Sequence, residues 1–208
     1  MGNLVVIDYD AGNLYNVGNA LRHLGADFVM SGDPDRVARA DRVILPGVGS
    51  ARAAMASLER QGLIDIISNL TVPFLGICLG MQLLFEESEE DRCPCLGLLP
   101  GTVRRFDRNR VKVPHIGWNE VEWRKTGPEQ RLLSLVGGLA PAGYFYFVHS
   151  YFAPILPGAT AAVTDYDGLF SAAVLKDNFL GLQFHPERSG APGLQLLQTF
   201  LSWEGDRA

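Results

Sequence analysis

Residues 74–80 read Phe74-Leu75-Gly76-Ile77-Cys78-Leu79-Gly80, and this short stretch decides the fold class. The apolar residues of 74–77 predict a buried strand, and the apolar residues of 79–86 predict a helix directly after it. Two glycines flank the central cysteine, and glycine lacks the Cβ atom that would obstruct a tight turn. A buried strand that turns sharply into a helix is a building block of α/β proteins.

The patterns on either side extend this unit. Before it, short apolar runs alternate with segments of helical spacing, which predicts βαβ units and a parallel sheet. After it, closely spaced strand patterns predict antiparallel hairpins, one of them turning at Asp177-Asn178. The expected strands are 4–7, 27–30, 43–45, 74–77, 103–106, 118–123, 144–152, 159–166, 170–175 and 179–184, and the expected helices are 17–24, 51–60, 63–70, 79–86 and 193–203.

The predicted architecture is therefore α/β. We expect an open, mostly parallel sheet flanked by helices, with antiparallel strands in the C-terminal half. The chain has 208 residues, and no repeat or linker divides it, so we expect a single domain over residues 1–208. Hydrophobic residues make up 47% and charged residues 20%, which is typical of a packed globular protein.

The charge pattern excludes some functions. Lys and Arg number 18 and Asp and Glu 23, which gives a net charge of −5 without a block of either sign. Nucleic-acid binding relies on basic side chains and is disfavoured. No basic leader precedes the first strand, and the longest apolar run, 72–85, is too short to span a membrane. Three cysteines, an odd and low number, indicate a reducing compartment, so we expect a cytoplasmic protein.

Cys78 is the first candidate for chemistry. Its pattern, G-x-C-x-G between a strand and a helix, has the form of a nucleophile elbow with cysteine in the place of serine. The N-terminus of the helix would favour a thiolate, and the backbone N–H of Leu79 would face an oxyanion. Taken alone, the pentapeptide fits a buried structural cysteine about equally well.

A thiol nucleophile needs a base, and His185 is the best placed of the four histidines. Pro186 favours extended chain at His185, and side chains two residues apart share a face of extended chain. Glu187 would thus orient the imidazole ring and stabilise its charged form, as the third member of a triad does. The alternative is a histidine at a strand end beside a solvent-facing glutamate.

The loop Pro46-Gly47-Val48-Gly49-Ser50 follows another predicted strand. Sites of α/β proteins assemble where parallel strands end, so Gly47 to Gly49 would supply a second oxyanion donor. Arg52 stands where a dinucleotide-binding fingerprint needs glycine, and this excludes that fingerprint. The alternative is an ordinary turn from strand to helix.

Two further groups of residues have plainer explanations. Cys93-Pro94-Cys95 has C-x-C spacing with no second Cys or His pair nearby, so we expect no metal site. The aromatic residues of 114–119 and 144–151 are mostly explained by packing. An exposed Trp118 would instead be a candidate anchor of an interface.

Cys78, His185 and Glu187, in this order, resemble the triad of the class I glutamine amidotransferases. Other segments resemble one branch of them, the glutaminase subunits of imidazole glycerol phosphate synthase, from residue 4 to beyond residue 200. The segments are Ile7-Asp8-Tyr9, Gly12-Asn13, Pro46-Gly47-Val48-Gly49, Gly76-Ile77-Cys78-Leu79-Gly80-Met81-Gln82, Pro114-His115-Ile116-Gly117-Trp118-Asn119, Phe147-Val148-His149-Ser150-Tyr151 and Gln183-Phe184-His185-Pro186-Glu187. The elbow and His-Pro-Glu identify the class, whereas the segments around Trp118 and His149 point to the branch.

The resemblance implies a flavodoxin-like fold and hydrolysis of L-glutamine to glutamate and ammonia, without a cofactor or metal. It also implies a partner, a (β/α)₈-barrel cyclase subunit that forms a heterodimer with the glutaminase and uses the ammonia in histidine biosynthesis. The implied catalytic residues are Cys78, His185 and Glu187; the oxyanion residues are Leu79, Gly47, Val48 and Gly49; the substrate-binding residues are Gln82, Ser150 and Tyr151; and the partner-facing residues are Asn13, Trp118, Tyr146 and Arg188.

Three other interpretations stay open. Another amidotransferase is one, although the Gly-Gly-Glu-Ser-Thr segment of the pyridoxal phosphate synthase glutaminases is missing from this sequence. A cysteine protease or related hydrolase on the same fold would act without a partner and ignore free glutamine. A non-catalytic binding subunit would need a broken triad, and all three triad residues are present.

Overall fold

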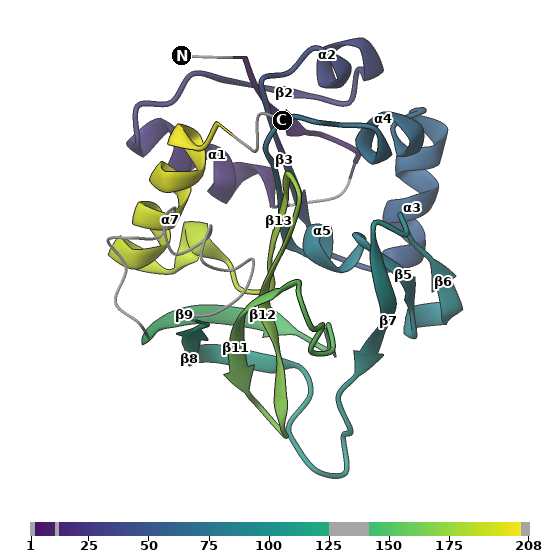
Figure 1. Ribbon diagram of the computed structural model, residues 1–208, viewed down its shortest axis with the longest axis vertical. Helices are drawn as coiled ribbons and strands as arrows, with labels where there is room; N and C mark the ends of the chain where they lie inside the picture. The colour runs from purple at the N-terminus through teal and green to yellow at the C-terminus, as the bar shows by residue number, and fades with distance from the viewer. Residues whose placement is uncertain (1–2, 11–12, 125–141, 205–208) are drawn as a thin grey trace.

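The computed structural model describes residues 3–10, 13–124 and 142–204. Within these residues, a nine-stranded sheet runs through the centre of the molecule and carries helices on both faces (Figure 1). The strand order is β2-β1-β3-β4-β13-β12-β11-β8-β9. The predicted α/β class, with helices flanking a large open sheet, is confirmed.

The half of this sheet from β2 to β13 in the strand order is parallel. Its strands are β1 (Leu4–Ile7), β2 (Phe28–Ser31), β3 (Arg42–Gly47), β4 (Phe74–Cys78) and β13 (Phe179–Leu182). The side chains of β1 alternate between two hydrophobic cores, with Leu4 and Val6 in one and Val5 and Ile7 in the other. A strand covered on both faces is apolar throughout, which explains its unbroken apolar sequence.

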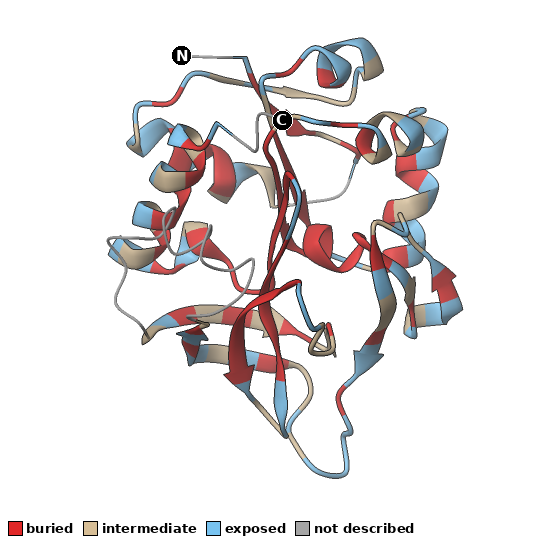
Figure 2. Cartoon of the chain, viewed as in Figure 1, coloured by how far each residue is buried: buried red, intermediate tan, exposed pale blue. Residues whose placement is uncertain are grey.

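Helices complete the two cores, one on each face of the sheet. The first face is covered by α1 (Leu14–His23) and α7 (Gly190–Ser202), and the second by α2 (Pro34–Ala38), α3 (Ala51–Arg60) and α4 (Ile64–Ser68). Leu21 of α1 and Leu197 of α7 share one core, whereas Leu58 of α3 and Ile67 of α4 share the other. Figure 2 shows the buried central strands and the exposed outer sides of these helices.

The C-terminal half of the sheet is antiparallel, as predicted. Its strands are β8 (His115–Trp123), β9 (Ala142–His149), β11 (Thr160–Asp165) and β12 (Leu169–Lys176), and Asp177-Asn178 turns β12 into β13. A second sheet has the order β10-β7-β5-β6. Its strands are β5 (Phe85–Ser88), β6 (Cys93–Pro94), β7 (Leu99–Arg105) and β10 (Tyr151–Phe152), and the short helices are α5 (Leu79–Gln82), η1 (Glu90–Arg92) and η2 (Pro186–Arg188).

Two predicted elements need correction at the second sheet. The helix expected over 79–86 ends at Gln82, and Phe85 starts β5. The strand expected over 144–152 bends at Ser150, so that β9 belongs to the large sheet and β10 to the small one. Both stretches are mostly apolar and short, so their hydrophobic pattern does not separate helix from strand, or one strand from two.

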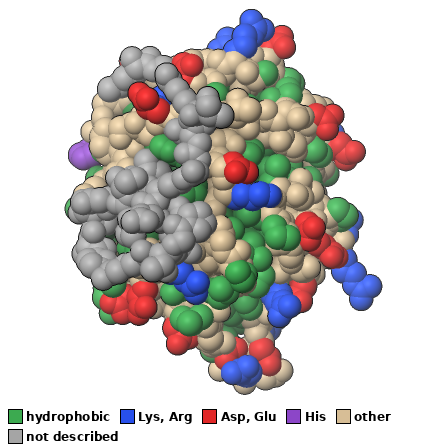
Figure 3. All heavy atoms as spheres, viewed as in Figure 1, with side chains coloured by type: hydrophobic (Ala, Val, Ile, Leu, Met, Phe, Trp, Pro, Cys, Tyr) green, Lys and Arg blue, Asp and Glu red, His purple; other side chains and the backbone are tan. Residues whose placement is uncertain are grey.

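The charged surface agrees with the composition. On the face drawn in Figure 3, acidic and basic side chains of the described residues are interspersed. That face therefore offers no extended basic surface to a phosphate backbone. Among the helices of the described ranges, none has the length and apolar character needed to cross a membrane.

The sheet brings the sequence motifs to one edge. Gly47, at the end of β3, lies opposite Cys78 at the end of β4, and Leu182 of β13 lies opposite Ile77. The segments that follow β3, β4 and β13 therefore start side by side. This edge is where ligand sites form in open parallel sheets.

Gly80 allows α5 to pack directly against β3. A Cβ atom at this position would lie 1.9 Å from the carbonyl oxygen of Leu45, a backbone atom that cannot rotate away. We predict that Gly80→Ala lowers the free energy of unfolding by at least about 3 kcal/mol, measured by urea unfolding. Gly143→Ala is the matched control, because among the described residues its Cβ would meet only the Phe145 ring, at 3.5 Å. Equal stability of the two variants would contradict the close packing of α5.

Candidate active site

Cys78 lies on a strained turn between β4 and α5. Its backbone φ of 53° and ψ of −107° are unfavourable for a residue with a side chain. The turn depends on glycine on both sides, because a Cβ at Gly76 would lie 2.5 Å from the carbonyl oxygen of Gly80. The sequence prediction of an elbow at Cys78 therefore matches the local geometry, and the strain marks a position held for chemistry.

His185 and Glu187 form a buried pair behind the cysteine. The Nδ1 atom of His185 lies 2.8 Å from Oε1 of Glu187, and both side chains are almost fully excluded from solvent. The backbone N–H of His185 donates to the carbonyl oxygen of Tyr146 at 2.9 Å, which fixes the residue after β13. The side chain of Asn13 donates to the same Glu187 oxygen at 3.3 Å. The carboxylate thus holds the imidazole ring in one orientation.

The electrostatics of His185 favour its charged form. Burial alone would lower the pKa of the imidazole, but the nearby Cys78 thiolate and the Glu187 carboxylate raise it to about 10. The second ring nitrogen, Nε2, is buried and makes no hydrogen bond to the described residues. The arrangement supports an imidazolium at His185 beside the sulfur of Cys78.

The loop after β3 lies against the elbow. A Cβ at Gly47 would be 2.7 Å from both the backbone nitrogen of Gly80 and the Cβ of Leu79, so this close approach requires glycine. Gly49 has a φ of +96°, which also favours glycine. Ser50 caps α3 by accepting from the N–H of Ala53 at 3.4 Å. The loop is therefore held closely at both ends.

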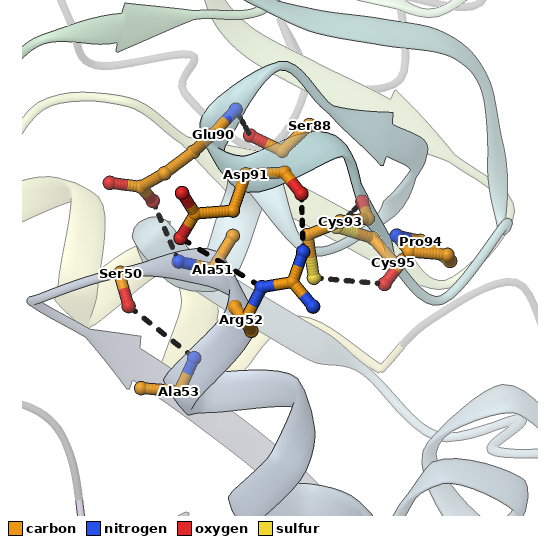
Figure 4. Close-up of polar contacts among 10 residues, drawn as sticks. All are labelled: Ser50, Ala51, Arg52, Ala53, Ser88, Glu90, Asp91, Cys93, Pro94 and Cys95. Atoms are coloured by element: carbon orange, nitrogen blue, oxygen red, sulfur yellow. Dashed lines mark hydrogen bonds and ion pairs between the residues drawn. The ribbon is translucent and has the colours of Figure 1, made fainter.

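A second contact ties this loop to the small sheet (Figure 4). The carboxylate of Glu90, in η1, accepts a hydrogen bond from the backbone N–H of Ala51 at 2.7 Å. Asp91 contacts the side chain of Arg52 through both its backbone carbonyl and its carboxylate. The start of α3, directly after the candidate oxyanion loop, is thus anchored to η1.

A cavity of about 340 Å³ opens in front of Cys78. It brings together two of the three predicted loop residues, the nucleophile and Leu79, and all three predicted substrate-binding residues. The lining consists of Val48, Gly49, Cys78, Leu79, Gln82, Glu90, Pro114, Val148, His149, Ser150 and Tyr151. Gly47, His185 and Glu187 are not among the lining residues. Gly47 lies opposite Cys78 in the sheet, and His185 and Glu187 are buried. A cavity of this size fits a small amino acid rather than a large ligand.

Three lining or adjacent residues were not predicted from the sequence. Glu90 places a carboxylate at the cavity, and its signal was hidden in the acidic stretch before Cys93. Gln183 is fully buried and makes hydrogen bonds to both Cys78 and Gln82. His149 lines the cavity from β9. Each depends on strands that meet only in the folded chain.

His149 is unsuited to the role of base despite its place. Burial lowers the pKa of His149 to about 3 and that of His115 to about 4. His149 Nδ1 lies 2.8 Å from the carbonyl oxygen of Tyr151 and must donate to it, so Nε2 accepts from His115 Nδ1 at 3.0 Å. This neutral pair supports the wall of the cavity, and the raised pKa leaves His185 as the candidate base.

The predicted partner-facing residues gather beside the active site. Trp118 is 55% exposed and lies opposite Tyr146 in the β8–β9 pair, and the guanidinium of Arg188 lies 4.2 Å from the centre of the Tyr146 ring. Ile116 adds a second exposed apolar side chain on β8. Asn13 is half-buried and donates a hydrogen bond to Glu187, the residue before Arg188.

Comparisons with known proteins agree with this geometry. The family model for glutamine amidotransferase class-I matches residues 5–202. Imidazole glycerol phosphate synthase subunit HisH 2 of Legionella pneumophila (strain Philadelphia 1) is 48% identical over 203 residues, which are 97% of this chain and 98% of the relative. The HisH subunit of Shewanella loihica is 44% identical over 207 residues, which are 95% of this chain and 89% of the relative.

Solved structures share the fold at low sequence identity. The structure of PurLQS from Thermotoga maritima superposes with a TM-score of 0.72 at 20% identity, covering 97% of this chain and 98% of that chain. A glutamine amidotransferase from the same organism gives 0.64 at 19% identity, covering 96% of each chain. Together with the elbow, the buried His–Glu pair and the relatives identical at nearly half their positions, these findings show that the chain belongs to the class I glutamine amidotransferases and, within them, to the HisH family.

Proposed function

We propose that this chain performs the reaction of its HisH relatives with the residues assembled at the elbow. It is the glutaminase subunit of imidazole glycerol phosphate synthase, and it hydrolyses L-glutamine to glutamate and ammonia for histidine biosynthesis. The observation that carries the residue assignment is Cys78, strained at the elbow and open to a cavity, with the buried His185–Glu187 pair behind it.

The first half-reaction forms a thioester and releases ammonia. The Cys78 thiolate attacks the side-chain carbonyl carbon of glutamine, and the electron pair moves onto the carbonyl oxygen. The backbone N–H of Leu79 and the loop of Gly47, Val48 and Gly49 stabilise this oxyanion. His185 then gives its proton to the leaving nitrogen, the carbon–nitrogen bond breaks, and ammonia departs.

The second half-reaction hydrolyses the thioester and regenerates the free enzyme. His185, now neutral, takes a proton from water, and the resulting hydroxide attacks the glutamyl thioester. The carbon–sulfur bond breaks, and the sulfur leaves as the thiolate paired with imidazolium. Glu187 keeps the ring in place throughout and stabilises its positive charge.

The cavity supplies groups for the other end of glutamine. Gln82, Ser150 and Tyr151 line it together with the loop residues Val48 and Gly49. The Glu90 carboxylate would pair with the α-ammonium group of the substrate, while its bond to the Ala51 N–H holds it in place. A ligand lacking that ammonium would leave a negative charge unpaired at the cavity.

The partner is the cyclase subunit of the synthase, and the chemistry explains why one is required. Ammonia released into bulk water near neutral pH is mostly protonated and no longer nucleophilic, so it must pass to the acceptor site inside protein. We propose a (β/α)₈-barrel cyclase that forms a heterodimer through the patch of Trp118, Tyr146 and Arg188, with Asn13 beside it. We also propose the cytoplasm as the compartment, which suits the free thiols at Cys78, Cys93 and Cys95.

Cys78→Ser and His185→Ala test the triad. We predict that each lowers glutamate release from L-glutamine by about 10³-fold or more, because triad members act as a unit. Cys95→Ser is the control, since this free thiol does not line the cavity. Circular dichroism should show all three variants folded. Substantial ammonia release by Cys78→Ser would reject the nucleophile assignment.

Glu187→Gln tests the charge of His185 through the pH profile. The pKa of His185 is raised to about 10, so the imidazolium needed to protonate ammonia persists until the pH approaches that value. Removing the carboxylate lowers the pKa of His185, and we predict that the alkaline limb of kcat at saturating glutamine moves down by about one pH unit. The profile of kcat reports groups of the enzyme–substrate complex, so the titration of free glutamine does not set this limb. Superimposable profiles would contradict the assigned role of Glu187.

The patch is tested by binding and by activation. We predict that glutamate release rises strongly when the cyclase is added together with its nucleotide ligand, and that Trp118→Ala weakens the complex by about 30-fold, as loss of an interface anchor does. Isothermal titration calorimetry measures the affinity. Leu169→Ala is the control, because Leu169 is similarly exposed, at 58%, on β12. Equal losses with both variants would count against the patch.

A further inference from the structure

Gln183 occupies a central position that none of the predicted roles explains. It is fully buried and follows β13, and its backbone N–H continues the sheet by donating to the carbonyl oxygen of Ala172 at 2.9 Å. Because Leu182 lies opposite Ile77, Gln183 comes next to Cys78 across the sheet. His185 follows two residues later, also beyond the end of β13.

The carboxamide of Gln183 connects two residues of the active site. Its Nε2 donates to the sulfur of Cys78, with a nitrogen–sulfur distance of 3.7 Å. Its Oε1 accepts from Nε2 of Gln82 at 2.9 Å. Gln82 Nε2 also donates to the carbonyl oxygen of Tyr151 at 2.8 Å. A chain of hydrogen bonds therefore runs from the cavity wall at Tyr151 to the nucleophilic sulfur.

The direction of this chain is fixed by its outer end. A backbone carbonyl only accepts, so the Gln82 atom that faces Tyr151 must be the nitrogen. Both hydrogens of that nitrogen are then used, one on Tyr151 and one on Gln183, so the Gln183 atom facing Gln82 must be the oxygen. The Gln183 nitrogen is consequently left for the sulfur, to which it can only donate.

This polarity has a consequence at each end. An N–H that donates to sulfur stabilises the thiolate relative to the neutral thiol. At the other end, Gln82 keeps its Oε1 as the atom available for a donor in the cavity. Such a donor is what the α-ammonium group of glutamine provides.

We propose that Gln183 is a positioning residue that sets the Cys78 sulfur and the Gln82 carboxamide in one geometry, coupling the nucleophile to substrate recognition. The proposal rests on the function assigned to Cys78 and Gln82 above. It requires an amide at position 183: leucine or methionine would supply neither bond, and glutamate would keep the acceptor for Gln82 but turn an acceptor toward the sulfur.

Two variants separate the two bonds. In the complex with the cyclase, we expect Gln183→Met to lower kcat and to raise KM for glutamine, each by about tenfold, because both bonds are lost. We expect Gln183→Glu, which has nearly the same shape, to lower kcat by at least about tenfold while KM stays within about twofold. One oxygen of the new carboxylate still accepts the hydrogen bond from Gln82.

The sulfur contact is also measured without catalysis. We expect iodoacetamide to alkylate Cys78 at pH 6 about tenfold more slowly in Gln183→Met than in the unmodified sequence, followed by mass spectrometry of the Cys78 peptide. Asn178→Ala is the matched control. Asn178 carries another buried carboxamide beside the same strand, where it donates to the carbonyl oxygens of Leu70 and Val72.

The outcomes distinguish a positioning role from simple packing. If both Gln183 variants lose thermal stability as Asn178→Ala does, yet keep normal alkylation and the same KM and kcat, the proposal is overturned. If Gln183→Met does not fold, Gln183→Glu decides by its kcat and its alkylation rate. If the unmodified complex releases no glutamate from glutamine, the proposed function fails, whereas the alkylation rates still test the contact between Gln183 and the sulfur.

Discussion

The active site depends on the contact between three backbone segments that only glycine permits. Gly47 of β3, Gly76 of β4 and Gly80 of α5 meet at distances that leave no room for a Cβ atom. This contact lets α5 start directly at the end of β4 and holds Cys78 at a positive φ. Strain of this kind costs about 1–3 kcal/mol and persists only where the surroundings enforce it. The packing of glycine against backbone is what enforces it at Cys78.

Two histidines near the same cavity show how the environment sets chemical roles. His149 faces a backbone carbonyl and a second neutral imidazole, and burial lowers its pKa to about 3. His185 is similarly buried, but a carboxylate and the Cys78 thiolate outweigh the effect of burial and raise its pKa to about 10. Burial is common to both residues, so the anionic neighbours decide which one carries a proton at neutral pH.

The sequence allowed prediction of those features that are written in local patterns. The elbow around Cys78, the His185–Glu187 spacing and the loop from Gly47 to Gly49 each lie within a few residues, and the structure brings all of them to one edge of the sheet. Gln183 and Glu90 were missed because their partners are distant in sequence: Cys78 is 105 residues from Gln183, and Ala51 is 39 residues from Glu90. No local pattern records such contacts. The small sheet was mostly missed for a related reason, since three of its four short strands lie within residues 85–105 and the fourth, β10, lies at residues 151–152.

The two sheets contribute different groups to the candidate site. The large sheet supplies Cys78, the proposed nucleophile, from β4 and the proposed catalytic pair that follows β13, whereas η1 and β10, in and beside the small sheet, supply Glu90 and Tyr151 to the cavity wall. The hydrogen bonds that join the two parts of the cavity wall include Gln82 to Tyr151 and Glu90 to Ala51. The loop proposed to hold the oxyanion ends at Ala51, which Glu90 contacts, and Gln183 links Gln82 to the sulfur of Cys78. In the proposed mechanism, these hydrogen bonds connect the groups that would recognise the amino-acid end of glutamine with the groups that would react at its side chain.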